Sequence, residues 1–292
     1  MTLPRRLIVS GDDFGVALEV NEGIVRAHRE GILGQTSLMV TGTAAAHAVD
    51  LARAHPSLAV GLHLVLAQGR PAAPPREIPA LVRADGAFRD APIRNGLRYA
   101  WAYVRAAGRA QLVREIEAQL AAFARTGLRL AHVDGHLNIH LHPMVLPILL
   151  ALAPRYGIRA MRVSRESLAA ALRYDRRHAL RKCFEGVAFH ALAAYAAPRL
   201  RAAGIASSDR VFGMHQTGHV DEAYLLHVIA TLPPGVSEVY GHPATRQAPV
   251  MAGFQDGYDH AGEVAGLTSP RVRAALEAAG VELTTYRDLE RA

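Results

Sequence analysis

The sequence predicts a single α/β domain with a (β/α) barrel-like, TIM-barrel-related fold, regular or distorted. Three observations support this prediction. Short apolar runs alternate with helical patterns about eight times along the 292 residues, half of all residues are hydrophobic, and polar side chains gather where several apolar runs end. Alternating strands and helices are typical of parallel sheets with helical crossovers, and about eight such units favour a barrel.

The elements follow in order along the chain. Apolar runs predict strands at Arg6–Gly11, Gln35–Thr41, Leu58–Leu66, Leu130–Ile139, Arg159–Val163, Arg210–Met214, Ser237–His242 and Val281–Thr285. Periodic patterns predict helices at Val20–Glu30, Ala44–Ala54, Ala110–Thr126, Pro143–Tyr156, Glu185–Ala203, Glu222–Thr231 and Pro270–Ala279.

Two insertions, at about 67–108 and 164–209, interrupt the repeat within one domain that spans residues 1–292. Each insertion follows a predicted strand. We therefore expect both to lie near the C-terminal mouth of the barrel, where the active sites of barrels form.

Composition limits the classes of function. The single cysteine, Cys183, excludes an intrachain disulfide and fits a reducing compartment. No stretch of roughly 18 apolar residues is present, and the apolar run Leu7–Val9 is too short for a signal peptide, so we expect a cytoplasmic protein without a spanning helix. The formal charge of +7 comes with no nucleic-acid motif, so we expect no nucleic-acid partner.

Residues 132–143 carry a polar side chain at every second position. The polar residues are His132, Asp134, His136, Asn138, His140 and His142. On an extended chain this alternation places all six side chains on one face. A half-exposed edge strand is the plain alternative, but such strands normally carry lysine, threonine or glutamate. The run therefore predicts metal or proton chemistry.

Three more signals lie at or near the ends of other predicted strands. Asp12 and Asp13 follow the first strand, His63 lies in the third, and His242 ends the strand at Ser237–His242. Each has an ordinary alternative: a pair of helix caps, a satisfied core histidine, or a histidine in a turn. Because parallel strands bring their carboxyl ends together, we expect these residues to meet. One aspartate and two histidines can bind a metal and leave positions open for water and substrate.

With these motifs the sequence resembles the YdjC-like carbohydrate deacetylase family. The resemblance rests on Asp12 to Gly15, Gly61 to His63, the His-x-Asp-x-His-x-x-x-His run at 132–140, and Gly241 to Pro243. Within that family it looks most like the hopanoid-biosynthesis-associated branch, which implies an N-acetylglucosaminyl hopanoid as substrate. Asn138 stands where the soluble chito-oligosaccharide enzymes more often have histidine, so no role is carried over to it.

The resemblance implies a role for each site residue. Asp13, His63 and His136 would bind one divalent metal, with zinc fitting this set best and magnesium second. Asp12 would be the general base and His242 the general acid, with a carboxylate or carbonyl partner on its second ring nitrogen. Four further residues are expected around these five. Arg162 would orient Asp12 or bind substrate, His140 would be the alternative acid, and His132 and Asp134 would hold substrate or supporting positions.

The same residues are compatible with other functions. A chito-oligosaccharide deacetylase would use the same chemistry on a soluble sugar. A metal-dependent phosphoesterase would need a second metal and a glycine-rich phosphate loop, and a non-catalytic sugar-binding module would not need Asp12.

The segment Glu166–Ser207 combines apolar residues with arginines. This pattern fits peripheral contact with anionic lipid, or an ordinary helix pair packed on the barrel. The sequence leaves a homodimer open.

Overall fold

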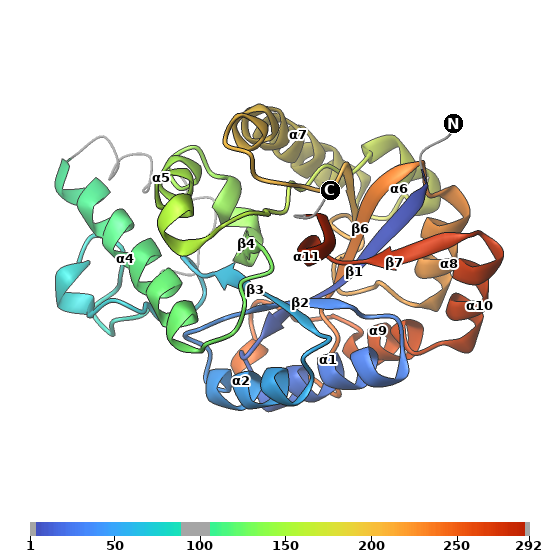
Figure 1. Cartoon of the computed structure of the whole chain (residues 1–292), viewed down its shortest axis with the longest axis horizontal. Helices are drawn as coiled ribbons and strands as arrows, with labels where there is room; N and C mark the ends of the chain where they lie inside the picture. Colours follow the sequence, from blue (N-terminus) through green and yellow to red (C-terminus); the bar gives the residue numbers. More distant parts are fainter. Residues whose placement is uncertain (1–3, 89–105, 290–292) are drawn as a thin grey trace.

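The computed structural model describes residues 4–88 and 106–289. Within these ranges, a seven-stranded parallel sheet curls into a half-barrel (Figure 1), which confirms the barrel-like prediction. Its order is β4-β3-β2-β1-β6-β5, and β7 also pairs with β1. The strands are β1 (Arg5–Phe14), β2 (Gln35–Leu38), β3 (Ala59–Leu64), β4 (Val133–Gly135), β5 (Arg210–Phe212), β6 (Gly235–Gly241) and β7 (Val281–Thr284).

The first strand, β1, is the centre of the sheet because it has three neighbours. It pairs with β6 from Arg5 to Gly11, with β7 from Arg5 to Ile8, and with β2 from Ser10 to Phe14. Strands β7 and β2 thus follow one another along β1. All but the first two residues of β1 are buried, as expected for a parallel strand covered on both faces.

The prediction of a regular strand at Arg159–Val163 is wrong. This part of the chain makes only isolated bridges, from Met161 to Val133 and from Ala160 to Ala206. These bridges nevertheless extend the hydrogen-bonded path from β4 toward Ala206, which lies shortly before β5. The curl of the sheet therefore continues there without a regular strand.

Most helices surround the curled sheet, and the short last helix lies within the curl (Figure 1). The helices are α1 (Leu18–Glu30), α2 (Ala45–Ala54), α4 (Ala106–Arg125), α5 (Leu146–Tyr156), α6 (Leu168–Tyr174), α7 (Ala179–Ala202), α8 (Glu222–Thr231), α9 (His260–Leu267), α10 (Pro270–Ala278) and α11 (Tyr286–Leu289). The 3₁₀ turns are η1 (Pro75–Glu77), η2 (His136–Leu141) and η3 (Pro249–Met251). Helix α8 has the predicted bounds, whereas α6 and α9 were not predicted because both are too short to show a clear period.

The two predicted insertions differ in what the structure describes. In the first insertion, residues 89–105 lie outside the described residues. Earlier in that insertion, the backbone N–H groups of Ala72 and Ala73 donate to Glu115 of α4 at 2.9 Å. The second contains α6 and α7, and α7 contacts η2 beside the strand ends. In the described ranges, no helix has the length and apolar character needed to cross a membrane.

Candidate active site

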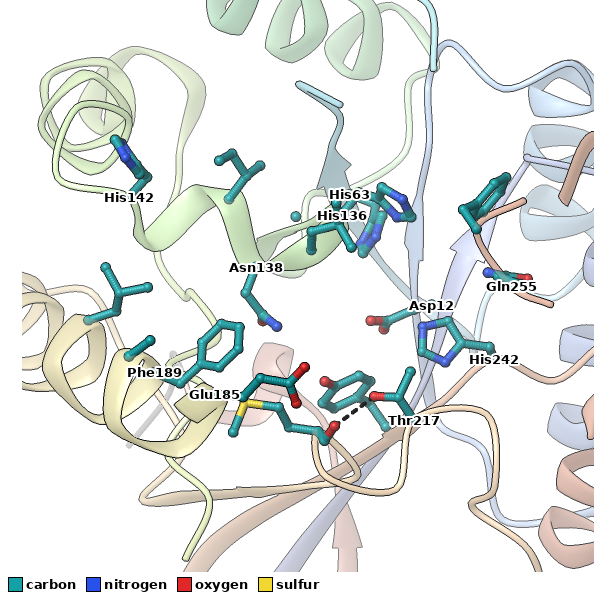
Figure 2. Close-up of a pocket in the computed structure, with 18 of the residues that line it drawn as sticks. Asp12, His63, His136, Asn138, His142, Glu185, Phe189, Thr217, His242 and Gln255 are labelled. Atoms are coloured by element: carbon teal, nitrogen blue, oxygen red, sulfur yellow. Dashed lines mark hydrogen bonds between the residues drawn. The ribbon is translucent and has the colours of Figure 1, made fainter. Parts of the chain in front are cut away.

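A cavity of about 590 Å³ lies at the carboxyl ends of the strands. Figure 2 shows its polar end, where Asp12, His63, His136 and His242 lie close together. The opposite wall comes mainly from α7 and its neighbours and is mostly apolar, with Ile139, Phe184, Ala188, Phe189, Leu192 and Met214 beside the ion pair of Arg181 and Glu185. The cavity thus joins a cluster of ionisable groups to an apolar surface.

The two aspartates lie where β1 becomes irregular. The register between β1 and β2 shifts between Gly11 and Phe14, and Asp13 has a φ of 65°. Few residues other than glycine adopt this left-handed conformation, and aspartate tolerates it better than most. Such an irregularity re-aims neighbouring side chains. As a result, Asp12 and Asp13 both reach the polar cluster instead of pointing to opposite faces of the sheet.

Asp13, His63 and His136 present three ligand atoms to one point. Asp13 Oδ1 lies 3.1 Å from His63 Nε2 and 3.2 Å from His136 Nδ1. All three residues are buried, and their ligand atoms lie within 4.8 Å of one another. The structure therefore brings together the set that the sequence predicted as ligands.

The outer nitrogen of each histidine already faces an acceptor. His63 Nδ1 lies 2.8 Å from Asp134 Oδ1, and His136 Nε2 lies 3.0 Å from Gln68 Oε1. If each outer nitrogen carries the proton, each neutral ring turns a lone pair toward Asp13. These lone pairs and the carboxylate repel one another unless a cation lies between them. The residues therefore fit a divalent metal ion, with Asp134 and Gln68 fixing the ring orientations.

The carboxylates around this point stabilise positive charge. Burial alone would lower the pKa of His63, but Asp134 and Asp13 raise it to about 10. Burial would raise the pKa of Asp13, yet His136 and His63 hold it well below its usual range. Positive charge is thus favoured where the three ligand atoms converge.

Arg162 is buried beneath the cluster and binds three carboxylates. Its two terminal nitrogens lie 2.7 and 2.8 Å from the two oxygens of Asp12. The same guanidinium lies 2.9 Å from Asp134 and 2.9 Å from Glu238. Burial would lower the pKa of Arg162, but these carboxylates hold it well above its usual range. Arg162 therefore fixes the orientation of the Asp12 carboxylate.

His242 lies just after β6 and lines the cavity. Its backbone N–H donates to Glu263 of α9, and its carbonyl accepts from His260 Nδ1 at 2.6 Å. The close approach of Glu263 requires glycine at position 241, because a Cβ there would lie 2.7 Å from Glu263 Oε2. Two side chains of α9 thus hold the His242 backbone on both sides.

The ring of His242 does not have the partner that was expected. Within the described part of the chain, its Nδ1 is buried without a hydrogen-bond partner. Burial lowers the pKa of His242, although Asp13 and Asp12 partly offset this effect. The nearby aspartates favour the protonated ring, but burial outweighs them, so the pKa of His242 stays below its usual value.

The polar run at 132–143 is not one extended strand, which corrects the prediction. Strand β4 ends at Gly135, and η2 follows with Leu137 and Asn138 both at a φ of 56°. A 3₁₀ segment with two left-handed residues has no sequence period that alternation could reveal. The polar side chains of the run therefore take different directions.

Within this run, only some residues reach the cavity. Of the six polar side chains, those of His136, Asn138 and His142 line the cavity. His132 instead stacks on Tyr286, with ring centroids 5.0 Å apart. His140 Nε2 donates to the Arg162 carbonyl at 2.9 Å, and burial lowers the pKa of His140 to about 4. His140 is thus less well placed than His242 to protonate a substrate.

Three site residues do not emerge from the sequence. Gln255 donates from Nε2 to Asp13 Oδ2, and Gln68 faces His136. Both lie in loops, where no periodic pattern marks a side chain that points inward. Glu238 accepts from Arg162, and a lone carboxylate within the apolar strand β6 is a signal that could have found it.

Comparison with known proteins extends over most of the chain. The profile of a family described as YdjC-like protein matches residues 6–278. A carbohydrate deacetylase from Geobacillus stearothermophilus is 32% identical over 98% of this chain and 98% of its own length. A chitooligosaccharide deacetylase from Escherichia fergusonii is 34% identical over 57% of this chain and 62% of its own length.

A solved structure is similar over the same extent. The crystal structure of an Enterococcus faecalis protein, provisionally named for cellobiose-phosphate cleavage, has a TM-score of 0.75 and 26% identity. The match covers 98% of this chain and 99% of that one. The similarity of fold therefore includes the strands that position the site.

Proposed function

This chain belongs to the YdjC-like protein family, and from that membership and the site geometry we propose that it is a metal-dependent deacetylase. It would hydrolyse the N-acetyl group of an amino sugar and release acetate. The observation that carries this proposal is the convergence of Asp13, His63 and His136 on one point, with Asp12 and His242 beside them. The names of the relatives, carbohydrate and chitooligosaccharide deacetylases, support the same reaction.

Asp13, His63 and His136 are the proposed metal ligands, and zinc suits one carboxylate and two imidazoles better than magnesium does. A divalent ion in this position supplies Lewis acidity, which lowers the pKa of water and polarises the acetyl carbonyl. The residues around the ligands keep them in place. Asp134 and Gln68 hold the two rings, and Gln255 holds the second oxygen of Asp13.

Asp12 and His242 divide the proton transfers in this proposal. Asp12, held in orientation by Arg162, accepts a proton from the attacking water. The water oxygen bonds to the acetyl carbon, and the bond from that carbon to the sugar nitrogen breaks. His242 gives its proton to the nitrogen, so that a neutral amine leaves.

We expect His242→Ala to lower kcat by about 10²-fold, the usual order for a general acid, with metal content unchanged. Burial lowers the pKa of His242. The protonated ring is lost as the pH rises through that pKa, so the wild-type kcat should fall on the alkaline side. The variant should lack this fall. Equal rates for the two proteins across a pH profile of kcat would show that another group is the acid.

For the substrate, we propose N-acetylglucosamine carried on a hopanoid, a polycyclic lipid. The resemblance to the hopanoid-associated branch motivates this choice. The apolar wall supports it, because Phe184, Phe189 and Leu192 lie across the cavity from the ionisable cluster. A sugar alone would leave these side chains facing water or polar groups. A soluble chito-oligosaccharide is the second candidate, and the same catalytic residues would act on it.

Two other functions receive less support. A phosphoesterase with two metals would need the second candidate group, Asp12, His63 and Asp134, but Arg162 already binds both of these aspartates. A sugar-binding module would have no use for Asp12, a carboxylate beside the proposed metal ligands.

The deciding assay compares three substrates with zinc-loaded protein. These are an N-acetylglucosaminyl lipid in detergent, diacetylchitobiose, and a phosphate monoester. We expect acetate from the lipid-linked sugar at the highest kcat/KM, less from diacetylchitobiose, and no phosphate. Preference for diacetylchitobiose would refute the lipid substrate alone, whereas absence of acetate from both sugars would refute the deacetylase.

A further inference from the structure

Three large apolar side chains on α7 are exposed. Leu180 is 89% exposed, and Phe184 and Val187 are each 70% exposed. Their spacing of four and three residues places them on one face of the helix. We call these three residues the α7 ridge. Scattered apolar residues are normal on a surface, but three on one helix face form a feature that calls for a partner.

The opposite face of α7 explains why the ridge points outward. Lys182 is buried on that face, and its Nζ donates to the carbonyl and the carboxylate of Asp175 at 2.9 and 3.0 Å. Farther along, Ala193, Ala196 and Leu200 are also buried. These contacts fix the rotation of the helix, so the ridge is a stable part of the surface.

The ridge is continuous with the cavity. Phe184 belongs to the ridge and also lines the cavity, and Ala188, Phe189 and Leu192 of the same helix continue the apolar wall inward. Figure 2 shows this helix beside the polar cluster, with Phe189 pointing into the space between them. An apolar path therefore leads from the exposed surface into the candidate active site.

The stretch of chain that carries the ridge has a net positive charge. From residue 168 to residue 190 the chain has five cationic side chains and two carboxylates. Both carboxylates are already paired, Asp175 with Lys182 and Arg177, and Glu185 with Arg181. Arg173 and Arg176 are also exposed. An apolar ridge with a basic border is the pattern of a surface that rests on anionic lipid.

We propose that the α7 ridge docks on an anionic lipid bilayer, with the mouth of the cavity facing the membrane. The ridge would enter the boundary between headgroups and acyl chains while the arginines contact the headgroups. This docking goes beyond the proposed reaction. It rests on the proposed function in one respect only, that a lipid-linked substrate would pass along the ridge into the cavity. A second copy of this chain suits the ridge less well, because a two-fold contact would place the same arginines against each other.

The test uses the full chain and vesicles of two compositions, phosphatidylcholine alone or mixed with phosphatidylglycerol. The variant Leu180→Ser/Val187→Ser removes two ridge residues that do not line the cavity. The control is Leu18→Ser. Leu18 is 52% exposed and begins α1, a helix that lies on the side of the molecule away from α7 in Figure 1. Co-sedimentation gives the partition coefficient of each protein, and hydrolysis of diacetylchitobiose is measured on the same samples.

We expect the wild type and Leu18→Ser to bind the anionic vesicles, and the ridge variant to bind them about tenfold more weakly. Binding should decrease as salt rises from about 50 to about 500 mM, because the headgroup contacts are screened. Unchanged hydrolysis by the ridge variant would show that its site is intact.

Equal binding by the ridge variant and the control, or no binding to anionic vesicles at low salt, would overturn the proposal. A dimer in analytical ultracentrifugation that the ridge substitutions dissociate would overturn it in favour of a second copy. Vesicle binding without hydrolysis of diacetylchitobiose would exclude only that soluble sugar as a substrate and would leave the docking surface standing.

Discussion

Replacing His63 with alanine is expected to abolish metal binding and, with it, deacetylase activity. His63 Nε2 and Asp13 Oδ1 are 3.1 Å apart at the point where the three ligand atoms converge. The substitution leaves two ligands, and it also leaves Asp13 and Asp134 without the ring that lies between them. Repulsion between these carboxylates then adds to the loss of a ligand. We expect metal content to fall from one ion per chain to a small fraction, as measured by plasma mass spectrometry after dialysis.

The control for this substitution is His219→Ala. His219 is an exposed histidine in a loop, so its removal tests whether the loss of any histidine lowers metal content. Circular dichroism of both variants shows whether the fold is kept. A folded His63→Ala protein that retains one metal per chain and full turnover would remove His63 from the ligand set.

The sequence identifies most of the polar cluster because the cluster is built on strand ends. Asp12, Asp13, His63 and His242 each belong to or follow an apolar run that becomes a strand. In a parallel sheet, the carboxyl ends of neighbouring strands lie at one edge. Proximity of these residues therefore follows from the fold class alone, before any contact is known.

The remaining parts of the site depend on contacts that no local pattern contains. Gln255 reaches Asp13 from 242 positions away, through a loop whose path is set by packing. The directions of His132, His136 and His140 depend on where β4 stops and η2 begins. Polar and apolar residues alternate across that boundary without interruption, so the pattern could not mark it.

The ridge on α7 could be predicted from the sequence only in part. The sequence shows that apolar and basic residues are mixed between Glu166 and Ser207, but it places a helix only from Glu185 onward. The structure begins α7 at Ala179. Because the helix starts earlier, Leu180, Phe184 and Val187 are helical and lie on one face. They therefore form one apolar ridge, which separate loop residues would not.

Replacing Asp12 with asparagine is expected to lower kcat by about 10²-fold or more while the metal stays bound, since removal of a general base typically has this effect. An asparagine fits the space of the aspartate but cannot accept the proton from water. Arg162 should stay in place, because Asp134 and Glu238 still bind its guanidinium at 2.9 Å. The measurement is kcat together with metal content for the variant and the wild type.

The control for Asp12→Asn is Glu238→Gln, which weakens one contact of Arg162 without touching Asp12. If Asp12 acts only by holding Arg162, the two variants should lose similar activity. If Asp12 is the base, Asp12→Asn should be slower by at least an order of magnitude, since only this variant removes the proton acceptor. Turnover close to wild type would exclude Asp12 as the base. Loss of metal would make Asp12 a ligand and favour the alternative group of Asp12, His63 and Asp134.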